Sequence, residues 1–424
     1  MERIVLEKIC RDESRFTYAF FVTEGLEKFF APVPFIVEYS VDVSRVPDAI
    51  AAIPFIANVL PIIWLSNSEL VLPELDKAFY ECIPDLKKGY ETMFPGCAFR
   101  GKISVEKIVA CDIPATGKSA MLYSGGLDAT HTLVRHMDER PDMLTVWGSD
   151  IRFENQDGWN VMNRGIQETL RSYQLDQVVI RSSFRDFDRE GVLTQTYKKR
   201  LKDNWWHGVK HGIGLLGHAA PYAYANGVSK LYIASSNCPA DGPVRCASNP
   251  LTDNQVRFAN CRVVHDGFEC SRQDKVRDVV VYASQKNMPL HLHVCWQSQS
   301  GDNCCRCEKC YRTIAAILAE GADPAAFGFE SAWDTLDDME EYLYDGGLSA
   351  GTAKRQWTHI QNRARANREM LKRKGYWKHI SWIETINFAK YQSRKEPLQI
   401  RIRGYLAKFH FYQVLHRIKG KLYE

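Results

Sequence analysis

The chain has 424 residues, of which 45% are hydrophobic and 25% charged, the composition of an ordinary folded protein with two or three domains. Disordered, collagen-like and solenoid chains are excluded, because the chain has neither their compositions nor their repeats. The net charge of +4 conceals an asymmetry, since residues 351–424 carry 18 Lys and Arg against 4 Asp and Glu. Residues 1–350 carry 37 basic and 47 acidic side chains, so a basic C-terminal region follows an acidic body.

The N-terminal residues alternate charged and apolar side chains, whereas a secretory signal contains an unbroken apolar segment. The longest apolar stretch, residues 49–65, contains Pro54 and Pro61 and is shorter than the roughly 20 residues that a bilayer requires. We therefore expect a buried core segment there and no membrane span. The 13 cysteines then belong to a cytoplasmic protein in which thiols stay reduced.

Residues 1–118 predict an N-terminal α+β domain. Apolar runs at 16–22 and 34–43 are followed by the proline-containing stretch and by a helix expected near 72–79. The turn-rich segment 112–118 marks the first domain boundary.

From residue 119, short apolar runs alternate with amphipathic stretches, which is typical of βαβ units and a parallel sheet. We expect a doubly wound α/β domain over residues 119–325. The predicted strands are 119–123, 143–147, 177–180, 230–234 and 291–295, and the predicted helices are 129–137, 159–173, 212–226, 275–286 and 310–320.

Residues 326–424 predict a basic helical region. Apolar side chains at Trp357, Ile360, Ala364 and Leu371 recur at helical spacing, with arginines and lysines between them. Its charge fits a cover over the acidic body best, and RNA binding is the main alternative.

The most informative local sequence joins an apolar strand to a helix through Ser124, Gly125 and Gly126. Two glycines let backbone N–H groups approach an anion, and the helix that follows adds its positive N-terminal end. The Ser124 and Thr130 hydroxyls can donate further hydrogen bonds, and Asp128 beside a phosphate suits Mg²⁺ binding or orientation of the loop. We predict a phosphate-binding loop with Ser124 and Asp128 as catalytic residues. Its candidate residues are Leu122, Tyr123, Ser124, Gly125, Gly126, Leu127, Asp128, Ala129 and Thr130.

A second glycine pattern is formed by Gly212, Gly214 and Gly217, which spell GxGxxG. No strand is predicted before it and no ribose-binding acid lies at the right distance, so we expect these glycines to pack a helix against the sheet.

Four cysteines have the spacing C-x8-C-x2-C-x2-C, and Zn²⁺ takes four tetrahedral thiolates from such short spacings. An iron–sulfur cluster is the alternative. Cys305 can compete as a ligand. Strand alternation places His291 and His293 on the face of Cys295, which makes them alternative ligands, although packing or hydrogen bonding is the favoured role of both imidazoles. The predicted zinc ligands are Cys295, Cys304, Cys307 and Cys310.

Residues 121–130 resemble the SGGxDS signature of the PP-loop ATP pyrophosphatases, which cleave ATP between the α and β phosphates and transfer AMP to a substrate oxygen. Ala129 stands where that signature has its serine. With the cysteine array and Tyr311-Arg312-Thr313 that follow, residues 119–325 resemble the 7-cyano-7-deazaguanine synthases. The resemblance implies an adenine nucleotide alpha-hydrolase-like fold and a ligase that uses ATP, Mg²⁺ and structural Zn²⁺. Its substrate would be a 7-deazapurine carboxylate, activated for attack by ammonia.

The regions outside 119–325 have no counterpart in small stand-alone synthases. Longer relatives, some associated with bacterial antiviral defence, are thought to join the deazapurine to a protein amine, so a protein acceptor is the second hypothesis. A zinc-containing protein that binds or modifies tRNA through its basic region is the third. The tRNA-thiolating enzymes generally need a redox-active cysteine, for which Cys238 and Cys246 are the candidates.

Overall fold

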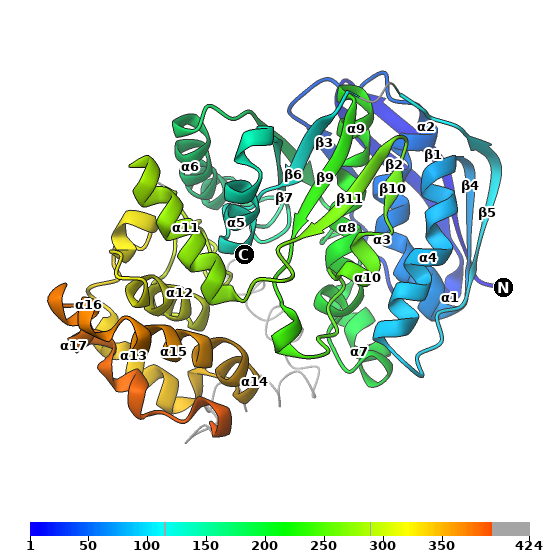
Figure 1. Cartoon of the computed structure of the whole chain (residues 1–424). Helices are drawn as coiled ribbons and strands as arrows, with labels where there is room; N and C mark the ends of the chain where they lie inside the picture. The colour runs from blue at the N-terminus through cyan, green and yellow to red at the C-terminus, as the bar shows by residue number, and fades with distance from the viewer. Residues whose placement is uncertain (114–115, 289, 392–424) are drawn as a thin grey trace, which may run out of the picture. The chain divides into compact units, whose positions relative to one another are not determined.

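The computed structural model describes residues 1–113, 116–288 and 290–391, shown in Figure 1. The chain divides into two compact units. The first holds residues 1–303 with 326–328, and the second holds residues 304–325 with the rest of the chain from 329 onward.

The first unit is built on an 11-stranded sheet in the order β10-β11-β9-β6-β7-β8-β3-β2-β1-β4-β5. Neighbouring strands from β11 to β8 are parallel, and the strand order reverses between β6 and β9. The predicted α/β class with a mostly parallel sheet is therefore confirmed. These strands are β6 (Lys118–Leu122), β7 (Asp142–Trp147), β8 (Gln177–Ser182), β9 (Val228–Ala234) and β11 (Cys261–Asp266), with the short β10 (Arg257–Phe258) at the edge.

Strands from the first 110 residues extend the same sheet. β3 pairs antiparallel with β8, and its Val37 lies opposite Ser182. The strands before and after the predicted boundary at residue 118 consequently share one sheet. The N-terminal strands are β1 (Arg3–Asp12), β2 (Arg15–Val22), β3 (Phe35–Tyr39), β4 (Glu69–Asp76) and β5 (Lys102–Val109).

Helices cover both faces of the sheet (Figure 1). α5, which follows the glycine loop, packs against α11 and β9, whereas α8 packs against α3. The helix predicted at 212–226 is divided into α8 and α9 and preceded by a π-helical turn, Trp206–Lys210. The helices of this unit are α1 (Glu24–Glu27), α2 (Asp48–Ala51), α3 (Ile53–Ser66), α4 (Lys77–Met93), α5 (Leu127–Arg135), α6 (Gln156–Ser172), α7 (Glu190–Leu201), α8 (His211–His218), α9 (Ala220–Asn226), α10 (Pro250–Asp253) and α11 (Arg272–Lys286).

Two predicted elements are wrong. Residues 72–76 belong to strand β4, because β4 pairs in parallel with β1 and β5, and α4 begins only at Lys77. Residues 291–295 form no strand: His293 N–H donates to Gly125 O at 2.8 Å, and Leu292 N–H donates to Phe327 O at 3.0 Å. β11, which the sequence analysis missed, lies between β9 and the edge strand β10.

The apolar stretch 49–65 forms α2 and α3, and every side chain of α3 from Ile53 to Leu65 is buried. This confirms the predicted core segment. Among the described residues, no helix has the length and apolar character needed to cross a membrane. Gly214 and Gly217 of α8 pack against α3 and not against the sheet, since a Cβ on Gly217 would lie 2.4 Å from Ala57 Cβ, whereas a Cβ on Gly212 would meet Ala247 O.

The second unit is helical in its described part, as predicted. Trp357, Ile360, Ala364 and Leu371 are all at most 2% exposed, so the predicted apolar positions are buried. Residues 392–424 of the predicted region lie outside the described residues. The helices are α12 (Glu308–Ala319), α13 (Leu336–Tyr342), α14 (Ala350–Thr352), α15 (Thr358–Ala366), α16 (Arg368–Arg373) and α17 (Trp377–Ile380).

Candidate functional site

The glycine loop lies between β6 and α5, at the carboxyl end of β6. Gly125 has a φ of +72°, in the left-handed region that favours glycine, and Gly126 is the N-cap of α5. Thr130 N–H donates to Gly126 O at 2.9 Å, so the helix begins directly after the two glycines. The first N–H groups of a helix have no acceptor within the helix, and they make this end of α5 suited to an anion.

The loop also lies where the strand order reverses. β6 and β9 are parallel neighbours, and their connections leave in opposite directions along the sheet. In open α/β sheets, ligands bind at the carboxyl ends of the strands beside such a reversal. The predicted phosphate loop therefore occupies the position at which this topology most often binds ligands.

Two cations from α11 converge on Asp128. Arg272 Nη1 donates to Asp128 Oδ2 at 2.9 Å, and Lys275 Nζ lies 3.4 Å from Asp128 Oδ1. Lys275 is 1% exposed and also donates to the backbone oxygen of Ser235, which directly follows β9. Two positively charged side chains thus contact the carboxylate of Asp128 beside the loop.

The sequence analysis missed both cations. A weak signal was present, because Arg272 and Lys275 are three residues apart and share one face at the N-terminus of α11. Their approach to the loop depends on the packing of α11 against α5, which local sequence does not specify.

The other predicted loop residues differ in accessibility. Ser124 is exposed, and its Oγ accepts a hydrogen bond from Gly126 N–H at 3.3 Å. Thr130 is fully buried, and its hydroxyl lies 3.4 Å from the Tyr123 hydroxyl. Burial raises the pKa of Tyr123 to about 12, so this pair stays neutral. Leu122, Leu127 and Ala129 are buried as well.

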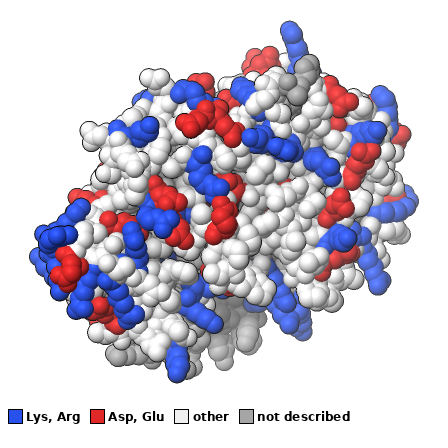
Figure 2. Space-filling model, viewed as in Figure 1, with Lys and Arg blue, Asp and Glu red and all other residues white. Residues whose placement is uncertain are grey.

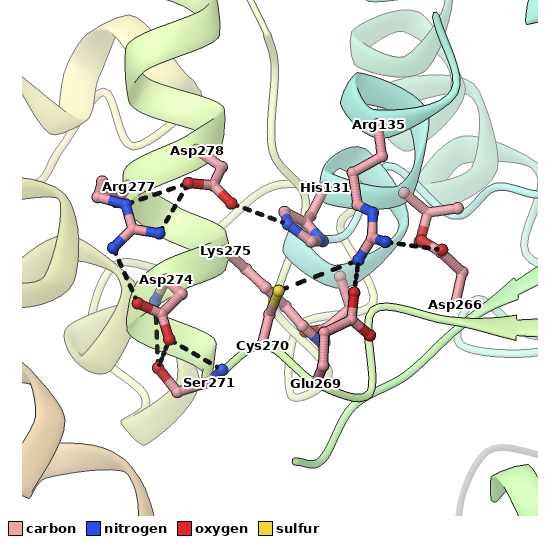
Figure 3. Close-up of polar contacts among 12 residues, drawn as sticks. His131, Arg135, Asp266, Glu269, Cys270, Ser271, Asp274, Lys275, Arg277 and Asp278 are labelled. Atoms are coloured by element: carbon pink, nitrogen blue, oxygen red, sulfur yellow. Dashed lines mark hydrogen bonds and ion pairs between the residues drawn. The ribbon is translucent and has the colours of Figure 1, made fainter.

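A polar network joins α5 to α11 and β11 beside this site (Figure 3). His131 Nε2 lies 3.2 Å from Asp278 Oδ2, and Arg135 pairs with Glu269 and Asp266. The ligand atoms of His131, Asp278 and Cys270 lie within 4.8 Å of one another. Arg135 Nη1 lies 4.0 Å from Cys270 Sγ, and this positive group opposes a cation there. We infer that this network holds α5 in position beside α11 and β11.

The four predicted cysteine ligands form one cluster. Their Sγ atoms all lie within 4.8 Å of one another, and three of the four residues are buried. Thiolates bound to zinc at about 2.3 Å in a tetrahedron lie about 3.8 Å apart. The Cys304 and Cys310 sulfurs are 3.9 Å apart, so the spacing fits a metal such as zinc. Among the described residues, neither Cys305 nor the two predicted alternative ligands, His291 and His293, joins this cluster.

Backbone contacts position the first cysteine. The Asn303 side-chain oxygen accepts hydrogen bonds from the N–H groups of Val294 and Cys295, at 2.9 and 3.2 Å. His293 N–H donates to Gly125 O, so the segment that carries Cys295 also supports the glycine loop. Sequence spacing identified the cysteines but not this connection.

The second unit supports the other cysteines. Cys307 is the N-cap of α12, and Cys310 lies in its first turn. The side chain of Trp357 donates to Glu308 Oε1 at 3.1 Å, and Arg363 pairs with Glu320 at the other end of α12. The C-terminal helices therefore hold α12 and its cysteines in place.

Lys and Arg side chains gather over α16 and α17 (Figure 2). Residues 351–391 carry 10 Lys and Arg against 2 Asp and Glu. Part of this charge is compensated locally, since Arg368 pairs with Glu384 at 3.5 Å and Lys372 with Glu369 at 2.9 Å.

We expect this surface to be solvated and not to bind RNA. Because local partners offset part of its charge, a fluorescent 20-nucleotide RNA should show no binding by anisotropy at 150 mM salt. The triple variant Lys372→Gln, Arg373→Gln, Lys378→Gln should retain the wild-type rate of ATP cleavage. RNA binding that weakens steeply with salt and is lost in this variant would contradict the expectation and favour an RNA substrate.

Comparison of the chain with protein-family models, curated proteins and solved structures finds no match. Its function is therefore inferred from its own residues.

Proposed function

We propose that the protein is an ATP-dependent adenylating enzyme that resembles the 7-cyano-7-deazaguanine synthases. It activates a carboxylate of a deazapurine with release of pyrophosphate, and a nitrogen nucleophile then displaces AMP. The observation that carries the proposal is the convergence of Arg272 and Lys275 on Asp128 beside the Ser124-Gly125-Gly126 loop.

Each residue has a role in this reaction. The loop N–H groups and Ser124 bind phosphate oxygens, and Arg272 with Lys275 stabilises the charge that develops on departing pyrophosphate. Asp128 is the carboxylate that would hold Mg²⁺, which neutralises phosphate charge when bound. Lys275 is nearly buried, and a charge in such a site acts more strongly than one in water.

A plain glycine turn between a strand and a helix is the simpler interpretation of the loop. It does not explain why a buried lysine and an arginine are both directed toward the same short loop, where they share the single carboxylate of Asp128. A site for an additional anion, the phosphate of ATP, gives both cations a role.

The zinc cluster has a structural role in this proposal. Four thiolates would complete the tetrahedral coordination of a zinc ion and would leave no open position for a substrate. Its contribution is to support the segment that contacts Gly125.

The acceptor is ammonia or, as the second candidate, a protein amine. Residues 326–424, which have no counterpart in the small synthases, are the reason for keeping a protein acceptor as the second candidate.

The reaction can be tested with purified protein, ATP, Mg²⁺ and 7-carboxy-7-deazaguanine as the probe carboxylate. We expect AMP and pyrophosphate in equal amounts by chromatography, and a new amide, nitrile or conjugate by mass spectrometry when ammonia or a protein amine is added. Release of ADP and orthophosphate would count decisively against the proposal.

A further inference from the structure

A cysteine, two histidines and an aspartate form a second reactive cluster in the first unit. The π-helical turn Trp206–Lys210 and the start of α8 place His207 and His211 four residues apart on one face. Ala247 N–H donates to His207 O at 2.8 Å, which holds the adjacent Cys246 beside this turn. His207 Nδ1 donates to Asp203 Oδ2 at 2.5 Å, which leaves Nε2 free to face the thiol. A thiol, an imidazole and an orienting carboxylate are thus close together, as in cysteine-dependent acyl-transfer sites.

Electrostatics favour the thiolate in this cluster. Burial raises the pKa of Cys246, but the hydrogen bonds and charges of His207 and His211 outweigh it and lower the pKa to about 6. The hydrogen bond to Asp203, followed by that to Cys246, raises the pKa of His207 to about 10. At neutral pH the pair is therefore a thiolate and an imidazolium. Burial first, and then the negative charges of Asp253 and Cys246, raise the pKa of Tyr90 on α4 well above its ordinary value.

Other cysteines in the same unit differ from Cys246. Burial raises the pKa of Cys82 and of Cys261 to about 12, although all three thiols are at most 2% exposed. The pKa of Cys238, in the same loop as Cys246, is raised first by burial and then by Asp241. Burial alone does not activate a thiol here, and the imidazoles make the difference.

The cluster lies near the carboxyl ends of the parallel strands, as the glycine loop does. Ser248 donates to Asp253 Oδ2 at 2.8 Å, and the same oxygen lies 2.8 Å from Nδ1 of His265. His265 is one residue from the carboxyl end of β11. The loop that carries Cys246 begins at Ser235, whose oxygen accepts from Lys275 of the phosphate site.

A metal site is the alternative use of these side chains. Among the described residues, two groups of side chains have their potential metal-ligand atoms within 4.8 Å of one another. They are the four-cysteine cluster and the group of His131, Cys270 and Asp278, and Cys246 belongs to neither. The hydrogen bond between His207 and Asp203 instead suits an imidazolium that stabilises a neighbouring thiolate.

We propose that Cys246 is a nucleophile that accepts the acyl group from the acyl-adenylate, with the imidazolium of His207 stabilising the thiolate and Asp203 positioning the imidazole. This inference rests on the proposed function, which supplies the adenylate. The thiolate attacks the acyl carbon, a C–S bond forms, and the C–O bond to phosphate breaks with its electron pair leaving on AMP. An amine then attacks the thioester, a C–N bond forms, and the thiolate leaves with the electrons of the C–S bond. The proton lost by the amine passes to solvent.

The first experiment does not depend on ATP. Cys246 is as buried as Cys82 and Cys261, so preferential alkylation would report its thiolate character and not its exposure, and the half-exposed side chain of His207 marks the side from which the reagent approaches. Iodoacetamide should alkylate Cys246 with a midpoint near pH 6, as followed by peptide mass spectrometry, whereas Cys82 and Cys261 serve as buried thiols that do not react. His207→Gln should move the midpoint toward the ordinary thiol value of about 8.5. Absence of preferential alkylation at Cys246 would overturn the inference alone.

The second experiment uses ATP, Mg²⁺ and 7-carboxy-7-deazaguanine with the full chain. A hydroxylamine-sensitive adduct should appear on the Cys246 peptide after acid quenching. Transfer to an amine should fall at least about 100-fold in Cys246→Ala and in His207→Gln, and the Cys238→Ala control should retain it. AMP formation and amine transfer without the adduct would overturn the inference and leave the proposed function intact. Absence of AMP would overturn both.

Discussion

Asp128→Asn should lower the rate of ATP cleavage to AMP and pyrophosphate by on the order of 10³-fold. The amide cannot supply the anionic oxygen that Mg²⁺ prefers, and it removes the charge that Arg272 and Lys275 share in the unliganded site. Lys275→Met should be nearly as severe, because a positive group 1% exposed beside the glycine loop is lost. Both rates are measured as pyrophosphate release in a coupled assay.

The matched control for the cations is Arg277→Met. Arg277 lies on the same helix, but it pairs with Asp274 and Asp278 and its side chain is 42% exposed. It should retain wild-type activity, and the melting temperatures of all variants should show that the fold persists. Activity near that of the wild type in a folded Asp128→Asn variant would rule out the proposed role of this carboxylate.

Removal of zinc should destabilise the protein by several kcal/mol, because metal binding energy at a structural site is folding energy. Elemental analysis should find about one zinc per chain, and Cys307→Ser should lose it with a fall in melting temperature on the order of 10 °C. Activity should fall as well, since the segment of Cys295 contacts Gly125 through His293.

Cys305→Ser is the matched control for this prediction. Cys305 is buried and adjoins Cys304, yet its sulfur is outside the cluster, so the variant should keep its zinc. A protein isolated without zinc, or with iron and a brown colour, would falsify the assignment.

Several features could be predicted because they depend on residues close together in the chain. The backbone freedom of Gly125 and Gly126 and the helix that follows are local properties, and so is the strand before them. The four cysteines were recognisable because three of them lie within seven residues, a spacing that one ion can bridge. Helical periodicity likewise identified the buried face that contains Trp357 and Leu371.

Other features were decided only by the tertiary structure. The pairing of β3 with β8, the approach of Lys275 to Asp128 and the contact of Cys246 with two histidines join residues that are 35 to 147 positions apart. Residues 291–295 also could not be predicted locally. Their alternating pattern suits a strand, but their backbone N–H groups donate hydrogen bonds to Gly125 O and Phe327 O instead. The hydrophobic pattern of a segment shows which of its side chains are apolar. Which strand or helix the segment contacts depends on the free energy of packing whole elements together, and a local segment does not determine that free energy.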